Sequence, residues 1–264
     1  MPKPRDPLRR RRYLVAYRTI VRKEIGRFVR IWVQTILPPA VTMTLYFVIF
    51  GHLIGPRIGA MGGFDYVQFI APGLIMMSVI TNAYANVVSS FFGAKFQRHI
   101  EELLVAPIPS AVIVGGLVTG GVARGLAVGA VVTGVALLFT QVHVHSFGIM
   151  FLTVFMSSVL FSLGGLLNGL FARSFDDTSI IPTFILTPLT YLGGVFYSIE
   201  LLPAVWRLIS RGNPILYMVN AFRYGVLGVS DIPLGLAFTV TGLSIVVLWS
   251  WAIWLFNRGV GIKT

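Results

Sequence analysis

Six long apolar stretches, separated by short polar or proline- and glycine-containing segments, dominate the pattern along this chain. They cover approximately residues 31–54, 67–92, 111–139, 147–171, 180–196 and 234–256. An α-helix needs about 20 apolar residues to cross the hydrocarbon of a bilayer, and these stretches are near or above that length. The pattern therefore predicts an all-α polytopic membrane protein with six transmembrane helices.

Composition supports this class. Apolar residues make up 56% of the chain and charged residues only 11%, a balance that excludes an ordinary water-soluble domain. We predict a basic cytoplasmic tail at residues 1–12 and a single membrane domain at 13–264. The chain contains no cysteine, which excludes a disulfide framework and a thiolate metal site.

Residues 13–30 are predicted to form a helix that lies in the membrane interface. Their apolar residues recur with a helical period and basic residues lie between them. The candidate residues of this helix are Tyr17, Arg22, Lys23, Glu24 and Arg27. A basic helix that binds nucleic acid is the competing interpretation, and it is disfavoured because the segment continues directly into the first span. No nucleic-acid partner is expected.

The segment 93–109, GAKFQRHIEELLVAPIP, is the main charged interruption between the spans. Phe96, Ile100 and Leu103 recur at helical spacing, while Glu101 and Glu102 occupy another face. We predict a short amphipathic helix that the following prolines end. On its pattern alone this helix is either a solvated loop or a contact for a soluble partner.

The second and third spans contain polar residues at helical spacing. Asn82, Asn86 and Ser89 or Ser90 would form a stripe on the second span, which also carries Ser78. The stripe would face either a transport pathway or, slightly favoured, hydrogen-bonding neighbours. Arg124 lies inside the third span and should pair with a carboxylate or backbone carbonyls, or extend along a tilted helix to the interface. Glycines spaced by four in the same span predict close helix packing on one face.

The region 197–233 contains two apolar pieces, around residues 201–209 and 215–227, that are short for a crossing. We predict re-entrant or interfacial helices on the external side, the second beginning at Asn213 and Pro214. Before the fifth span, Asp177 or Thr178 is the expected helix N-cap.

The distribution of basic residues tests the topology. With both termini and residues 93–109 in the cytoplasm, that side holds the eleven basic residues from Lys3 to Arg30 and five others, whereas the opposite side holds four. The four external ones are Arg57, Arg207, Arg211 and Arg223. This asymmetry fits the positive-inside rule with six spans.

Enzyme motifs are absent from the sequence, so no catalytic residue is predicted. His143 and His145 lie near no carboxylate or cysteine in sequence, and no metal site is expected. The C-terminal Gly259 to Thr264 has the wrong spacing for a phosphate-binding loop. Energy for uphill transport must therefore come from a partner.

The order of elements and the block Thr187–Gly225, TPLTYLGGVFYSIELLPAVWRLISRGNPILYMVNAFRYG, resemble the membrane subunits of ABC transporters of the type-2 export family. The block contains proline and glycine in the fifth span, a Leu-Pro pair, Asn-Pro and a later arginine, as that family's C-terminal signature does. The resemblance covers nearly the whole chain.

This resemblance implies a permease subunit of an ATP-driven exporter in the bacterial inner membrane. Two copies would pair, and two cytoplasmic ATPase subunits, which bind ATP and Mg, would dock on the segment 93–109. The coupling residues would be Phe96, Arg98, Ile100, Glu101, Glu102 and Leu103. The alternative is an ATPase-independent secondary carrier or a lipid-modifying membrane enzyme with a polar cavity.

Overall fold

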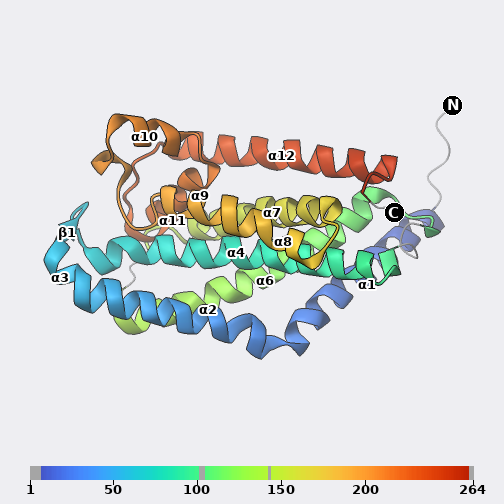
Figure 1. Ribbon diagram of the computed structural model, residues 1–264, viewed down its shortest axis with the longest axis horizontal. Helices are drawn as coiled ribbons and strands as arrows, with labels where there is room; N and C mark the ends of the chain where they lie inside the picture. The colour runs from blue at the N-terminus through green and yellow to red at the C-terminus, as the bar shows by residue number, and fades with distance from the viewer. Residues whose placement is uncertain (1–6, 101–104, 142–143, 262–264) are drawn as a thin grey trace.

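A computed structural model describes residues 7–100, 105–141 and 144–261. It is a bundle of long helices that run along its longest axis (Figure 1). The start of α1 and the end of α12 lie at the same end, which we call the proximal end. The opposite, distal end carries a small β-hairpin and the short helix α10.

The N-terminal helix α1 (Pro7–Arg30) turns at Ile31 into the first span. That span consists of α2 (Trp32–Tyr46), the π-helix η1 (Phe47–Ile54) and α3 (Gly55–Ile58). The helix α1 begins six residues earlier than the predicted interfacial helix. Residues 7–12, predicted as part of a tail, are therefore helical.

A two-stranded antiparallel hairpin connects the first span to the second. Strand β1 (Ala60–Met61) pairs with β2 (Phe64–Asp65). Gly62 and Gly63 between them both have positive φ, at 61° and 84°, a conformation that suits glycine in a two-residue hairpin turn. The following helix α4 (Tyr66–Phe96) contains the second predicted span and extends one turn beyond it.

The next long helices match the predicted spans closely. Helix α6 (Ser110–Phe139) contains the third, α7 (Phe147–Phe171) coincides with the fourth, and α12 (Leu234–Arg258) contains the sixth. Within the described ranges, five helical segments are long and apolar enough to cross a membrane. They are Trp32–Ile58, Tyr66–Phe96, Ser110–Phe139, Phe147–Phe171 and Leu234–Arg258.

The fifth predicted span is a broken helix and is not one of these five. It consists of α8 (Phe175–Ile181), the π-helix η2 (Pro182–Leu186) and α9 (Thr187–Leu192). At 1.5 Å per residue this run reaches about 27 Å, slightly less than the hydrocarbon thickness of a bilayer. The sixth crossing therefore stays a prediction.

Three short helices follow at or near the distal end: η3 (Ile199–Leu201), α10 (Ala204–Arg211) and α11 (Pro214–Leu227). The two longer ones confirm that the two apolar pieces form short helices. Helix α11 is mostly buried and packs against α4, α7 and α12. Helix α10 is mostly exposed.

The core lies where α4 and α7 cross, with α6 beside both. Close approach there depends on glycine, because a Cβ at Gly165 would lie 2.4 Å from the backbone oxygen of Tyr84. The glycines of α6 face two sides rather than the single predicted face. Gly116 and Gly120 meet α1, whereas Gly121 and Gly125 meet serines of α7.

Candidate functional site

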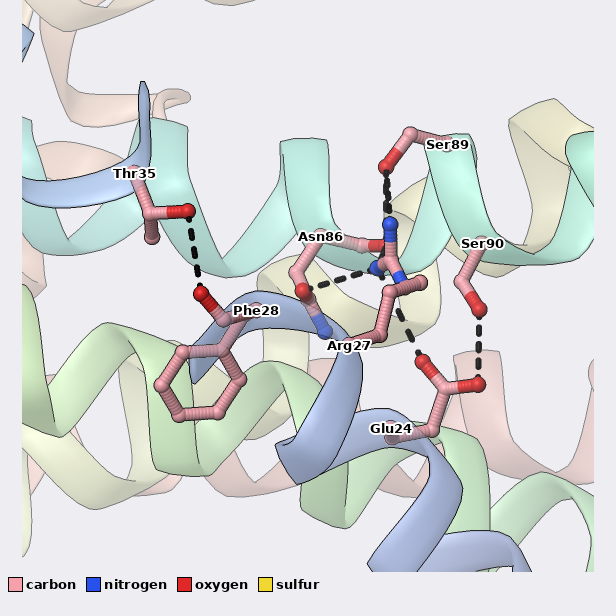
Figure 2. A network of polar contacts seen from close by, with 7 residues as sticks. All are labelled: Glu24, Arg27, Phe28, Thr35, Asn86, Ser89 and Ser90. Carbon is pink, nitrogen blue, oxygen red and sulfur yellow. Dashed lines mark hydrogen bonds and ion pairs between the residues drawn. The ribbon is translucent and has the colours of Figure 1, made fainter. Parts of the chain in front are cut away.

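A network of polar contacts joins α1 to α4 (Figure 2). Glu24 is only 2% exposed, and its Oε1 accepts a hydrogen bond of 2.7 Å from the Ser90 hydroxyl. Its Oε2 lies 3.7 Å from Nη2 of Arg27, one helical turn further along α1. A carboxylate buried in this way requires such partners.

Arg27 completes the contact. Its Nη2 donates to the backbone oxygen of Asn86 at 2.7 Å and to the Asn86 side-chain oxygen at 2.9 Å. Its Nη1 donates to the Ser89 hydroxyl at 3.3 Å. Burial lowers the pKa of Arg27, and the neighbouring Glu24 carboxylate opposes that shift. We call Glu24, Arg27, Asn86, Ser89 and Ser90 the α1–α4 joint.

Small residues on α6 allow α1 to reach this position. A Cβ at Gly116 would lie 2.6 Å from the Ile20 side chain, and one at Gly120 would lie 2.4 Å from Cβ of Glu24. The Tyr17 hydroxyl shares a hydrogen bond of 2.7 Å with the Thr119 hydroxyl. Close backbone approach thus brings Glu24 within reach of α4.

The five candidate residues of the N-terminal helix fall on two faces. Tyr17, Glu24 and Arg27 contact other helices, as described above. Arg22 and Lys23 are exposed. The side of the helix that faces the rest of the protein therefore contains an ion pair. The exposed side carries arginines between apolar residues such as Leu14 and Val15.

Arg124 of α6 has a different partner from those predicted. Its Nη2 donates to the side-chain oxygen of Asn82 at 3.0 Å, which is neither a carboxylate nor a backbone carbonyl. The Asn82 amide nitrogen in turn donates to the backbone oxygen of Ser78, whose own hydroxyl is buried. The polar residues of α4 thus contact α1 and α6.

Residues 93–96 of the segment 93–109 belong to the end of α4, and His99 and Ile100 are helical again after a turn. Helix α4 ends at Phe96, and Arg98 turns the chain with φ of 60°. Ile100 is buried in a core cluster with Val114 and Leu170. Glu101, Glu102 and Leu103, the other predicted coupling residues, lie outside the described residues.

At the distal end, Asn213 and Pro214 start α11 as predicted. The Asn213 side-chain oxygen accepts a hydrogen bond from the backbone N–H of Ile215 at 3.0 Å, while its amide nitrogen donates to the Leu189 carbonyl at 2.5 Å. Pro214 occupies the first helical position, where its missing N–H costs nothing. Asn213 therefore caps α11 and also fixes it to α9.

Arg223 was predicted on the external side and is the later arginine of the signature block, and the structure buries its side chain, which is 1% exposed. Its Nη2 donates to the Gly194 carbonyl at 2.6 Å and its Nε donates to the Phe69 carbonyl at 3.3 Å. The one feature of the sequence that indicates this burial is the position of an arginine within an apolar helical piece.

The N-cap expected for the helix before the fifth span was wrong. Ser174 rather than Asp177 or Thr178 is the N-cap of α8, and Asp177 occupies the N3 position of a capping box. Among the described residues, which include His145 but not His143, no group of three or more histidine and acidic side chains could hold a metal ion.

Residues 15–227 match the family described as ABC-2 type transporter. The chain is 62% identical over 252 residues to the inner membrane transport permease YadH of Escherichia coli K12, which covers 96% of this chain and 98% of the relative. The Shigella flexneri permease of the same name is equally similar.

A more distant relative is nodulation protein J of Rhizobium leguminosarum bv. trifolii, 25% identical over 179 residues, or 67% of this chain and 68% of that protein. The family match spans most of the chain, and the first relative spans nearly all of it. Together they confirm the resemblance inferred from the signature block. This multi-pass, mainly helical membrane protein belongs to the ABC-2 type transporter family of permeases.

Proposed function

We propose that this chain is the membrane-spanning permease subunit of an ATP-driven exporter in the bacterial inner membrane. Membership of the ABC-2 family and the name of the YadH relative support a transport permease in that membrane. A separate ATPase subunit supplies the energy by hydrolysing ATP with bound Mg. Its docking site is the segment 93–109, with Phe96, Arg98, Ile100, Glu101, Glu102 and Leu103 as the coupling residues.

The α1–α4 joint is the observation that carries this proposal. Helix α4 leads directly into the segment 93–109, so a force on that segment acts on α4 and, through Arg27 and Glu24, on α1. Charged hydrogen bonds with low exposure resist separation. The two helices therefore move together when the ATPase subunits close.

The proximal end is proposed to face the cytoplasm. The exposed basic residues Arg10, Arg11 and Arg12 belong to the start of α1, which lies at that end (Figure 1). This placement follows the positive-inside rule. Both termini would then be cytoplasmic, and basic α1 residues would contact anionic lipid headgroups of the inner leaflet.

Two copies of the chain would form the transport pathway between them, each with one ATPase subunit. The exposed side chains of α4, such as Thr81 and Ser89, give this helix a polar face that one protomer leaves uncovered. Such a face suits a pathway better than hydrocarbon. Asn82, Asn86 and Arg124 border this face, and rearrangement of their hydrogen bonds would accompany its opening.

Helix α10 is proposed to lie in the outer interface of the membrane. Val205, Leu208 and Ile209 are exposed on its outer side, while Arg207 bends back to donate to the carbonyls of Glu200 and Leu202. Trp206 is also exposed and suits the headgroup region. This is the arrangement of a short interfacial helix.

Capture of a partner tests the proposed function. The tagged chain is purified from mildly solubilised membranes, bound proteins are identified, and ATP hydrolysis is measured after reconstitution in lipid. A stoichiometric ATPase that is lost in the Glu101→Lys, Glu102→Lys double variant is expected. Transport or lipid modification by the chain alone, with no nucleotide-binding partner, would instead support the carrier or enzyme alternative.

A further inference from the structure

We infer that Arg27 and Arg124 form an anion-binding site beside the exposed face of α4, where they hold a phosphate or carboxylate group of the transported molecule. The inference rests on the proposed function and extends it, because it names the chemistry of the cargo. The site lies where α1, α4 and α6 meet. Buried N–H groups without partners lie beside its two positive charges.

The two guanidinium groups bind neighbouring turns of α4. Nη2 of Arg27 donates to the side-chain oxygen of Asn86 at 2.9 Å, and Nη2 of Arg124 donates to that of Asn82 at 3.0 Å. Because residues four apart lie on the same side of a helix, these contacts bring the two cations close together. Their charges repel each other, and an anion bound by both would offset that repulsion.

The charge of this cluster is not balanced. Glu24, whose Oε2 lies 3.7 Å from Nη2 of Arg27, is its one carboxylate among the described residues. Arg124 forms no ion pair in the part of the chain that the structure describes, and its one hydrogen bond there goes to Asn82. A guanidinium has five N–H donors. Two cations and one carboxylate therefore leave a positive charge with donors to spare.

Three buried N–H groups of the cluster lack a hydrogen-bond partner among the described residues, namely Nε of Arg27, Nε of Arg124 and Nδ2 of Asn86. Asn86 is fully buried, and its Nδ2 faces α6 at Gly120, one helical turn before Arg124. The Glu24 carboxylate cannot satisfy all three, because its Oε1 is already an acceptor and its Oε2 faces Nη2 of Arg27. Converging charged donors are what a phosphate or carboxylate group requires.

The cluster borders the face of α4 that one protomer leaves uncovered. Thr81 and Ser89, on this face, are exposed, and the Arg27 side chain is 29% exposed. Arg27 also donates to the Ser89 hydroxyl (Figure 2). Arg124 is half-buried. A molecule that moves along this face therefore passes both guanidinium groups.

The depth of the site excludes lipid headgroups as the anion. Arg124 is the fifteenth of the 30 residues of α6, so about 21 Å of helix lies on either side of it. Its acceptor Asn82 is likewise near the middle of α4. Half of the hydrocarbon of a bilayer is about 15 Å thick, so the headgroups of neither leaflet reach this level.

A second copy of the chain does not supply the anion either. The chain has nine acidic residues, and all of them lie outside the six predicted spans. Glu24 is the one beside the arginines, and it is buried within its own protomer. The others are Asp6, Asp65, Glu101, Glu102, Asp176, Asp177, Glu200 and Asp231. The missing anion is therefore assigned to the cargo.

A single thiol measures the electrostatic potential at the site. Because the chain has no cysteine, Thr81→Cys provides one thiol on the exposed face of α4. Its reaction rates with an anionic and a cationic methanethiosulfonate reagent are compared in phosphatidylcholine nanodiscs, each relative to the rate with a small free thiol. We expect a preference for the anionic reagent that falls about tenfold in Arg124→Met. Equal relative rates without that substitution would overturn the inference.

Two further variants separate the local charge from other effects. Arg124→Lys retains the charge and is expected to retain the preference, which distinguishes loss of charge from loss of fold. Arg57→Gln is the matched control, because Arg57 is exposed on α3 at the distal end of the bundle. A preference that fell as far in Arg57→Gln as in Arg124→Met would come from the overall charge of the protein and would count against the site.

Protection of the same thiol identifies the bound group. Dioctanoyl phosphatidate and dioctanoylglycerol share their acyl chains and differ by a phosphate group. We expect phosphatidate to slow the reaction, dioctanoylglycerol to leave it unchanged, and the protection to be lost in Arg124→Met. Equal protection by both compounds would indicate an apolar site, and protection by inorganic phosphate but not by phosphatidate would indicate a site for free anions. Either result would refute the proposal.

The outcomes for the two proposals are separable, because the thiol measurements use the permease alone. If the wild type captures an ATPase but the thiol shows no preference for the anionic reagent, the anion site fails and the proposed function stands. If no ATPase is captured while the preference and the protection hold, the proposed function fails, and the arginines bind an anion in a carrier instead.

Discussion

The guanidinium carbon of Arg223 lies 4.0 Å from the centre of the Phe69 ring, inside the distal part of the bundle. Arg223 belongs to α11 and is 1% exposed, and Phe69 belongs to α4. The same side chain donates to the carbonyls of Phe69 and Gly194. One cation thus holds α11, α4 and the turn after α9 together.

Replacing Arg223 by alanine is expected to lower the free energy of unfolding by about 3 kcal/mol or more, because two buried carbonyls lose their donor and a cavity forms. Arg223→Met should cost less than alanine, since methionine fills part of the volume. Thermal unfolding in detergent, followed by size-exclusion chromatography, measures both. Equal stability of wild type and Arg223→Ala would contradict this role.

Two adjacent glycines of α7 should differ in their tolerance of alanine. A Cβ at Gly165 would lie 2.4 Å from the Tyr84 carbonyl oxygen, whereas one at Gly164 would lie 3.5 Å from the Tyr84 ring. Gly165→Ala is therefore expected to destabilise the bundle by about 1–3 kcal/mol. Gly164→Ala is expected to be neutral, and the two unfolding midpoints compare the sites directly.

The α1–α4 joint predicts unequal effects of its two charges. Arg27→Gln removes three hydrogen bonds to α4 and should lower the free energy of unfolding by about 2 kcal/mol. Glu24→Gln keeps an acceptor for Ser90 and should cost about 1 kcal/mol. Arg22→Gln, at an exposed position, is the control. A double-mutant cycle that shows no coupling between Glu24 and Arg27 would refute the joint.

Arg124 and Asn82 should behave as a pair. Asn82→Leu removes the acceptor of a partly buried guanidinium and is expected to destabilise the protein by about 2 kcal/mol. Adding Arg124→Met should restore most of that loss, because the charge that needed a partner is gone. Chemical denaturation of the single and double variants checks this, and no recovery in the double variant would rule the pairing out.

The capping box of α8 predicts a dependence on pH. Hydrogen bonds from the Arg173 backbone N–H, the Ser174 side chain and the Ser174 backbone lower the pKa of Asp177. Because the folded pKa lies below the unfolded value of about 3.9, the contribution to stability is present above that pH and is lost as pH falls through the folded pKa. Unfolding midpoints between neutral pH and pH 3 should show this loss in the wild type but not in Asp177→Asn.

The control for that experiment is Asp176→Asn. The Asp176 carboxylate accepts none of the capping-box hydrogen bonds, so the acid-dependent loss should persist in this variant. If the acid-dependent loss of stability disappeared in both variants, the pH dependence would come from the helix dipole and not from the capping box.

Sequence predicted the helices better than their contacts. The fourth span was placed correctly because its apolar run is bounded by polar residues on both sides. The start of α1 was missed because Pro7 to Arg12 has no apolar periodicity to indicate a helix. The π-helical segment of the broken fifth helix was not predicted.

The partners of buried charges were the least predictable feature. Arg223 donates hydrogen bonds to backbone carbonyls. Because every residue has a backbone carbonyl, no residue type in the sequence identifies these acceptors. Arg124 pairs with a side-chain amide on another helix, whereas a carboxylate, backbone carbonyls or extension to the interface was expected. Phe175 contacts Phe96 only because α7 returns to the proximal end, a fact of topology.

The glycines of α6 that face α1 have a mechanical consequence. A helix surface without side chains presents few ridges, so the backbone of α6 at Gly116 and Gly120 offers little steric resistance to a small axial displacement of α1. Resistance to such sliding comes from directional bonds, namely those of Arg27 and Glu24 to α4 and the hydrogen bond between Tyr17 and Thr119 of α6. The register of α1 is therefore set by a few hydrogen bonds, and a change in them is enough to reset it.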